Sequence, residues 1–474
     1  MQQLAALARD SRALAARAVP LALTQLAQVA LTTTDTIMMG ALGTEALAAG
    51  GLALVIFNQL RTMGVGLVTS VGNQVAAAAA RAERAEETDG TAERTDGAEV
   101  RGLVRAAMAV ATLAGIAGAV LMVLIGQAAT WLGQDAAVAH HAQGMLAALS
   151  PGLLPCLWFQ AIRQFTVGMR RPQALLQITI ASVAVNAALN WAFIHGTWGF
   201  PELGLTGIGV ATSSVYLLSF LALYASARRD AQLAPLLSLD FWHADAPTVR
   251  RLLGLGTPIA ATYGSEAGFF SVTALLAGSF GAAALAAHTA VNQLIYIVFQ
   301  VAVGLSHAAS INVSRELTLG EYTAARRIKN TALACGAAVT TLVAVLYLTV
   351  PELVLRPYFD PSSAGDRQGL DVATGLLAVV AVLQFFDCAQ NIGVGLLRGL
   401  DDTKSGFRIT LVGYWLVGLP AAWLFAYPLG GETRGLWLGL LIGLATTAVL
   451  LLRRYSLALT ARAAAAPSTA PVGA

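Results

Sequence analysis

Twelve long apolar runs, separated by short polar clusters, are the feature that most limits what this 474-residue chain can fold into. A helix needs about 20 apolar residues to cross the hydrocarbon core of a bilayer. Within that core only helices and closed barrels satisfy every backbone polar group. The runs have helix length, so the sequence predicts an all-α integral membrane protein with twelve transmembrane helices. These are expected at 14–39, 46–79, 103–129, 137–162, 173–195, 206–226, 253–278, 284–313, 331–355, 370–397, 406–427 and 435–452.

Composition supports this class of protein. Only 12% of the residues are Asp, Glu, Lys or Arg and 57% are hydrophobic, whereas soluble domains carry about 25% charged residues. The three cysteines lie far apart in apolar stretches, and no phosphate-binding loop or metal-ligand spacing is present. We therefore expect a membrane protein that is not an enzyme, binds no nucleic acid and carries no cofactor.

The basic residues predict the orientation of the chain, because positively charged loops stay in the cytoplasm. If the N-terminus is inside, 25 of the 29 Lys and Arg residues fall in cytoplasmic segments. That count places Arg163 and Arg398 in such segments and leaves Arg61 as the one base within a span. Both termini are therefore expected in the cytoplasm. Alanine is abundant and arginine outnumbers lysine, which is typical of GC-rich bacteria, so the bacterial cytoplasmic membrane is the expected location.

The chain also repeats itself at an offset of 238 residues. Pro20 falls on Pro258 and Gly40 on Gly278, and 12 of 48 ungapped positions match. Gly168 with the following MRRP likewise resembles Gly399 with LDDT. Two homologous six-helix halves are expected, as in many secondary transporters. The predicted parts are an N-terminal lobe (1–226, with a flexible charged loop at 81–101), a cytoplasmic linker (227–251), a C-terminal lobe (252–455) and a disordered tail (456–474).

Three acids lie inside apolar runs, namely Asp35, Glu266 and Asp387. A charge near the bilayer centre costs about 2.5 to 3.5 kcal/mol, and such a residue is by default part of an ion or proton site. A structural hydrogen-bond network is the alternative. Asn186 and Asn190 lie one helical turn apart on one face and offer amide oxygens, which suit Na⁺. A proton needs only a carboxylate, so Na⁺ and H⁺ both remain open.

Four further residues are candidates for a substrate cavity. Gln28 lies two turns before Asp35 and coincides with Glu266 at the repeat offset. The aromatic side chains of Tyr263 and Phe270 could stack on a flat or cationic ligand, with ordinary packing as the alternative for each. Gln293 is the fourth candidate.

Several segments, taken in order, resemble one known family. They are PLALTQLAQVALTTTDTIMMG in the first helix, AAALAAHTAVNQ in the eighth, QFFDCAQNIGVGLLRGLDDTK around the tenth and YWLVGLP in the eleventh. From about Pro20 to Arg454 the chain is similar to multidrug and toxic compound extrusion (MATE) transporters of the NorM type. The resemblance implies a V-shaped arrangement of two six-helix lobes.

The resemblance also implies roles for residues of the first half. Asp35 matches an essential aspartate of the first helix. Asn186 and Asn190 match a neighbouring pair on the fifth helix, and Thr212 matches a hydroxyl of the sixth. These four residues are expected to take part in ion or proton coupling.

In the second half, Glu266 and Asp387 match acids that are proposed to bind Na⁺ in NorM-type members. The sequence departs from those members one turn before Asp387. There they carry a tyrosine that helps the ion site, and here the residue is Leu383.

The expected function is antiport: export of amphipathic, often cationic drugs in exchange for Na⁺ or H⁺, by alternating access of a monomer. The only other expected partners are the lipid bilayer and the coupling ion, and no metal other than Na⁺ is expected. A lipid-linked precursor flippase or polysaccharide exporter is the alternative. Such a protein should have a basic central cavity, yet Arg61 is the only base predicted in mid-span.

Overall fold

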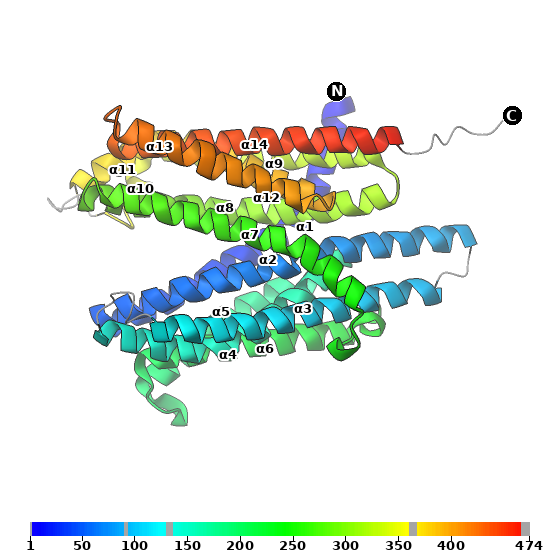
Figure 1. The fold of residues 1–474 in the computed structure, drawn as a ribbon, viewed down its shortest axis with the longest axis horizontal. Coiled ribbons are helices and arrows are strands. Elements are labelled where there is room, and N and C mark those ends of the chain that lie inside the picture. The colour runs from blue at the N-terminus through cyan, green and yellow to red at the C-terminus, as the bar shows by residue number, and fades with distance from the viewer. Residues whose placement is uncertain (1, 90–92, 129–135, 360–366, 466–474) are drawn as a thin grey trace. The chain divides into compact units, whose positions relative to one another are not determined.

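The computed structural model describes residues 2–89, 93–128, 136–359 and 367–465, and this part of the chain is helical without any β-strand (Figure 1). The first half contains α1 (Gln2–Ala41), α2 (Thr44–Asp89), α3 (Glu93–Ala128), α4 (Ala136–Gly168), α5 (Gln173–His195), η1 (Thr197–Gly199) and α6 (Gly204–Arg229). Two short 3₁₀ turns follow, η2 (Ala234–Leu236) and η3 (Phe241–His243). The second half contains α7 (Ala246–Gly278), α8 (Ala282–Thr318), α9 (Tyr322–Thr349), α10 (Pro351–Leu355), α11 (Arg367–Gly399), α12 (Thr403–Leu411), the π-helical η4 (Val412–Gly418), α13 (Leu419–Ala426) and α14 (Glu432–Ala465).

The twelve predicted spans are confirmed as helices. Ten helical segments of the described residues are long and apolar enough to cross a membrane by composition alone. The two others, α1 and α7, carry the polar runs TTTDT and TYGSE, which lower their average hydropathy. The predicted helix 331–355 differs in detail: it starts earlier, at Tyr322, and ends before Pro351, which opens the separate helix α10.

The charged segment 81–101 differs from the expected loop. Most of it forms the end of α2 and the start of α3, and Arg81 pairs with Glu99 between the two helices. Alanine, glutamate and arginine are all good helix formers, so this segment extends the spans. The predicted tail is also helical up to Ala465, and residues 466–474 lie outside the described residues.

Contacts divide the chain into two compact units, which we call the first unit (Arg17–Gly268) and the second unit (Met1–Ala16 with Phe269–Ala474). The boundary falls inside α7. The linker and α7 up to Gly268 therefore belong to the first unit, whereas the predicted C-terminal lobe was 252–455.

The repeat is visible in the packing of each unit. A Cβ built at Gly168 of α4 would lie 2.7 Å from the backbone oxygen of Gly72 in α2. A Cβ built at Gly399 of α11 would lie 2.7 Å from the backbone oxygen of Ser310 in α8. Gly72 and Ser310 are 238 residues apart, the offset found in the sequence. Both units therefore use one glycine contact to bring two helices together, which supports two homologous halves.

The turns after these glycines also match. Arg170 and Asp401 both adopt a left-handed backbone, with φ of 60° and 59°. The next residue, Arg171 or Asp402, returns its N–H to a carbonyl of the preceding helix, which is the Schellman arrangement that ends helices.

An ion pair fixes each turn to a later helix of its own unit, and its polarity is reversed between the units. Arg171 lies 2.7 Å from Asp230 at the end of α6. Asp402 lies 2.8 Å from Arg454 in α14. The turn is thus tied to a later helix through a basic residue in MRRP and through an acidic residue in LDDT.

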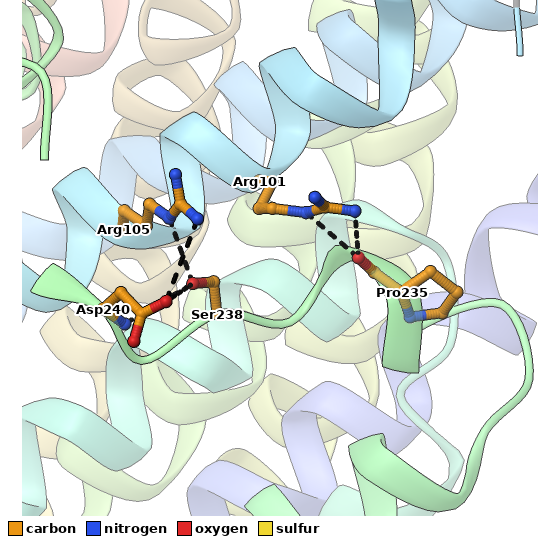
Figure 2. Close-up of polar contacts among 5 residues, drawn as sticks. All are labelled: Arg101, Arg105, Pro235, Ser238 and Asp240. Carbon is orange, nitrogen blue, oxygen red and sulfur yellow. Dashed lines mark hydrogen bonds and ion pairs between the residues drawn. The ribbon is translucent and has the colours of Figure 1, made fainter. Parts of the chain in front are cut away.

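The linker after α6 is bound to α3 (Figure 2). Arg101 donates two hydrogen bonds to the carbonyl oxygen of Pro235, at 3.1 and 2.7 Å. Arg105 donates to the hydroxyl of Ser238 at 3.0 Å and lies 3.9 Å from Asp240. The predicted linker is therefore an ordered strap on the first unit over these residues.

Candidate functional site

Asp35 is the centre of a buried polar site in the first unit. Its carboxylate oxygen Oδ1 accepts hydrogen bonds from the side-chain amides of Asn186 at 2.6 Å and Asn190 at 2.8 Å. Its other oxygen, Oδ2, accepts one from the hydroxyl of Thr212 at 3.0 Å. All four side chains are at most 2% exposed. The structure thus brings together the four coupling residues that the sequence predicted for this half, from three different helices.

The local sequence explains how α1 carries so polar a segment. The hydroxyls of Thr32, Thr33, Thr34 and Thr36 each bond to the carbonyl four residues earlier, which satisfies them within the helix. Asp35 is different, because its acceptors must find donors on other helices. The i, i+4 spacing of Asn186 and Asn190 on α5 supplies two such donors on one face.

The asparagine oxygens of this site have no hydrogen-bond partner among the described residues. Asn186 Oδ1 and Asn190 Oδ1 are both buried and unpaired, because each amide turns its nitrogen toward Asp35. Buried acceptors of this kind are costly. A rotation of either amide would offer Asp35 an acceptor in place of a donor, so the site can accommodate either a charged or a protonated carboxyl group.

Asp387 is the centre of a second network, in the second unit. Its Oδ1 accepts from the side-chain amides of Gln390 and Asn391, each at 3.3 Å. The oxygen of the Gln390 amide accepts from the hydroxyl of Tyr414 at 2.6 Å. The Tyr414 ring stacks on Phe269 with centroids 4.9 Å apart. The network thus joins α11 to the π-helical turn η4.

Sequence reasoning missed Tyr414. It noted that Leu383 replaces a tyrosine of NorM-type relatives, and Leu383 is here a core residue, 1% exposed. A tyrosine hydroxyl still reaches the Asp387 network, but from a different helix and through Gln390. The available signal was a lone tyrosine in the apolar run around Gly413, where a π-helical turn forms; such turns are frequent at functional sites.

The remaining candidates are dispersed between the two units. Glu266, Gln28 and Tyr263 are half-buried residues of the first unit. Phe270 packs against the core of the second unit, and Gln293 there is exposed. Their roles in coupling or substrate binding therefore remain predictions.

Two bases of the predicted cytoplasmic segments are buried in helices. Arg163 lies within α4 and is 5% exposed, and Arg398 lies within α11 and is 3% exposed. Both are followed closely by the glycine that ends the helix. The polar MRRP and LDDT turns follow shortly after them, and their location on the cytoplasmic side remains a prediction.

Comparisons with known proteins agree on one family. The MatE family model matches residues 20–88, 92–192 and 258–424. A protein of Pseudomonas aeruginosa named "Probable multidrug resistance protein NorM" is 34% identical over 442 residues, covering 93% of this chain and 88% of that protein. The "Multidrug resistance protein NorM" of Burkholderia vietnamiensis is 32% identical over 443 residues, covering 93% and 92%.

Solved structures share the fold. The crystal structure of MATE in complex with MaL6 has a TM-score of 0.83 at 14% identity, covering 95% of this chain and 97% of that one. The eukaryotic MATE transporter AtDTX14 has a TM-score of 0.79 at 20% identity, covering 97% and 99%. By its sequence, and with a fold that agrees, this chain belongs to the MATE family of membrane transporters.

Proposed function

We propose that this protein is a multidrug efflux antiporter that exports amphipathic, often cationic compounds in exchange for H⁺ or Na⁺ across the bacterial cytoplasmic membrane. The observation that carries the proposal is the buried carboxylate of Asp35, held by three donors from α5 and α6. The family match and the NorM names of the relatives support the multidrug part.

Asp35 is best suited to binding a proton. All three of its hydrogen-bond partners face it with donors, whereas Na⁺ prefers oxygen lone pairs. When Asp35 is protonated, its O–H must find an acceptor. The Thr212 hydroxyl or an asparagine oxygen can supply one after a rotation, so protonation changes the hydrogen bonds between α1, α5 and α6.

Through this rearrangement, proton binding at Asp35 can shift the equilibrium between two conformations of the protein. An ion shifts a two-state equilibrium only through a difference in its affinity for the two states. If one state holds the charged Asp35 network and the other a protonated network, proton binding favours the second. Alternating access driven by protonation follows from this difference, and Asp387 with Gln390 is the corresponding candidate in the second unit.

The test is transport by the purified protein in proteoliposomes. A cationic dye is measured under a pH gradient alone and under a Na⁺ gradient alone. We expect the pH gradient to drive the dye against the concentration gradient of the dye. Equal dye distribution under both gradients would contradict antiport.

Measurements in the same vesicles distinguish the antiporter from the alternative, a flippase or polysaccharide exporter. A lipid-linked precursor flippase should leave the dye distribution unchanged and should move a fluorescent polyprenyl-phosphate lipid between leaflets. An antiporter of amphipathic cations shows the opposite pair of results.

A further inference from the structure

The linker between α6 and α7 presents two adjacent aromatic rings at the surface of the first unit. Phe241 and Trp242 lie in the turn η3 with their ring centroids 4.0 Å apart, and Trp242 is 81% exposed. The residue before this pair, Asp240, is the one that Arg105 of α3 holds (Figure 2). The linker is therefore fixed on α3 at the point where it exposes a large apolar ring.

This point lies just beyond the apolar outer surface of α3. Leu113, Ile116 and Val120 are 60%, 52% and 55% exposed, as expected for side chains that face lipid. Ile116 follows Arg105 by eleven residues, about three helical turns, so the two lie on one face of α3. Leu113 begins the exposed apolar surface about 12 Å along the helix axis from Arg105. The linker thus lies near the level of the lipid headgroups, where tryptophan is enriched.

Basic residues flank the aromatic pair at both ends of the linker. Arg228 and Arg229 end α6, Arg250 lies in the first turns of α7, and all three are exposed. Neither Arg229 nor Arg250 has an ion-pair partner among the described residues. Their charges are therefore available to an anion at the surface.

The acids of the same segment are occupied by other contacts. Asp230 pairs with Arg171 at 2.7 Å, and Asp240 lies 3.9 Å from Arg105. Asp245 accepts hydrogen bonds from the N–H and the hydroxyl of Thr248. Two of the three acids thus lie beside arginines of other elements, which leaves the flanking arginines in excess. A phospholipid with an anionic headgroup complements this combination of positive charge and an exposed tryptophan.

We propose that the linker is a binding surface for anionic phospholipids: Trp242 inserts among the lipids at the headgroup level, and Arg229 and Arg250 bind the phosphate groups. Arg105 is a positioning residue that holds the aromatic turn on α3. The inference goes beyond the proposed function and does not depend on it.

A fluorophore beside Trp242 tests the proposal in the full-length protein. Cys156, Cys335 and Cys388 are replaced, and His243→Cys, at an exposed position, is labelled with an environment-sensitive dye. The protein in detergent micelles is titrated with phosphatidylglycerol or with zwitterionic phosphatidylcholine. We expect a saturable shift of the emission toward that of an apolar environment, at a lower mole fraction of phosphatidylglycerol than of phosphatidylcholine.

Variants separate the charged contact from the apolar one. Arg229→Gln and Arg250→Gln should each raise the mole fraction of phosphatidylglycerol at half-saturation about fivefold and leave the response to phosphatidylcholine unchanged. Trp242→Ala should weaken the response to both lipids. Arg327→Gln, at an exposed base of α9, is the matched control and should equal the parent protein. Thermal unfolding of each variant reports folding independently of lipid binding.

Three results would overturn the proposal. The first is an equal response to the two lipids. The second is Arg229→Gln and Arg250→Gln behaving like Arg327→Gln. The third is an emission that stays that of water with both lipids, which would leave the exposed ring to a soluble partner. Because the readout is lipid binding in detergent, none of these results bears on gradient-driven transport, and a failure of antiport leaves the lipid surface intact.

Discussion

At the scale of residues, Asp35 illustrates how a carboxylate can be buried in a membrane helix. Hydrogen bonds to a charged group contribute about 1.5 to 3 kcal/mol each, and Asp35 accepts three of them. Together they offset the cost of about 2.5 to 3.5 kcal/mol for a central charge. Removing the Asp35 carboxyl group or any of its three donors should therefore reduce ion-driven transport more than a substitution at the protein surface.

The Thr212 hydroxyl gives a clean test of this balance. Thr212→Val keeps the shape but leaves Asp35 Oδ2 without its donor, so we expect ion-driven efflux to fall about tenfold. Thr212→Ser keeps the hydroxyl and should retain most of the activity. Initial dye-efflux rates in proteoliposomes check this, and a valine variant as active as the wild type would exclude a role for the hydroxyl.

At the scale of elements, the glycines at the ends of α4 and α11 control how closely helices approach. Overpacking a close contact costs about 1 to 3 kcal/mol. A Cβ at Gly399 would clash with the backbone of Ser310. A side chain could rotate away, but a backbone clash is relieved only if the helix moves. The turn that carries the ion pair follows directly, so this contact also positions Asp402.

Alanine substitution tests the contact. Gly399→Ala should lower the free energy of unfolding by about 1 to 3 kcal/mol. Gly406→Ala in α12 is the matched control, because nothing lies within 4 Å of a Cβ there, and it should be neutral or stabilising by up to about 1 kcal/mol. Thermal unfolding in detergent compares the two, and equal stability of both variants would contradict the packing argument.

The ion pair at Asp402 should depend on pH. Burial works to raise the pKa of Asp402, but hydrogen bonds from Ser405 and Arg454 outweigh it and hold the pKa below its ordinary value of 3.8. A carboxyl group with a depressed folded pKa stabilises fully above its unfolded pKa and loses this contribution as the pH falls through the folded pKa.

Asp402→Asn should therefore be less stable than the wild type by about 1 kcal/mol or less near neutral pH, because the pair is partly exposed and screened. The difference should shrink below about pH 4. Thermal unfolding measured from pH 7 down to pH 3 checks the sign. The stability difference between Asp230→Asn and the wild type should also shrink on acidification, because the hydrogen bond from Arg171 lowers the pKa of Asp230. A difference that grows on acidification would contradict this account.

At the scale of the whole molecule, the long apolar runs predicted the helices and the repeat predicted the two halves. The Asp35 site was also predictable: the acid in an apolar run indicated a buried site, and the family resemblance supplied Asn186, Asn190 and Thr212 as its neighbours. Arg163 and Tyr414 were not, because no pattern in the sequence around either residue points to its partner, such as Gln25 for Arg163 or Gln390 for Tyr414. The boundary inside α7 was missed for the same reason: composition changes at the linker, whereas packing groups the linker with α3.

The predicted orientation is testable through this linker. A cysteine replacing exposed Ala231 should react with a membrane-impermeant maleimide only after cells are permeabilised. A cysteine at exposed Glu202, between α5 and α6, should react in intact cells. The background protein needs its own cysteines replaced, since Cys335 is partly exposed. The reverse labelling pattern would place both termini outside.

The most direct test of the central claim, that Asp35 binds the coupling proton, is dye accumulation driven by a pH gradient in proteoliposomes that contain Asp35→Asn protein. Asp371→Asn, at an exposed acid of α11, is the matched control. The account predicts that Asp35→Asn accumulates no more dye than vesicles without a gradient, while Asp371→Asn equals the wild type. Accumulation at the wild-type rate by Asp35→Asn would contradict it.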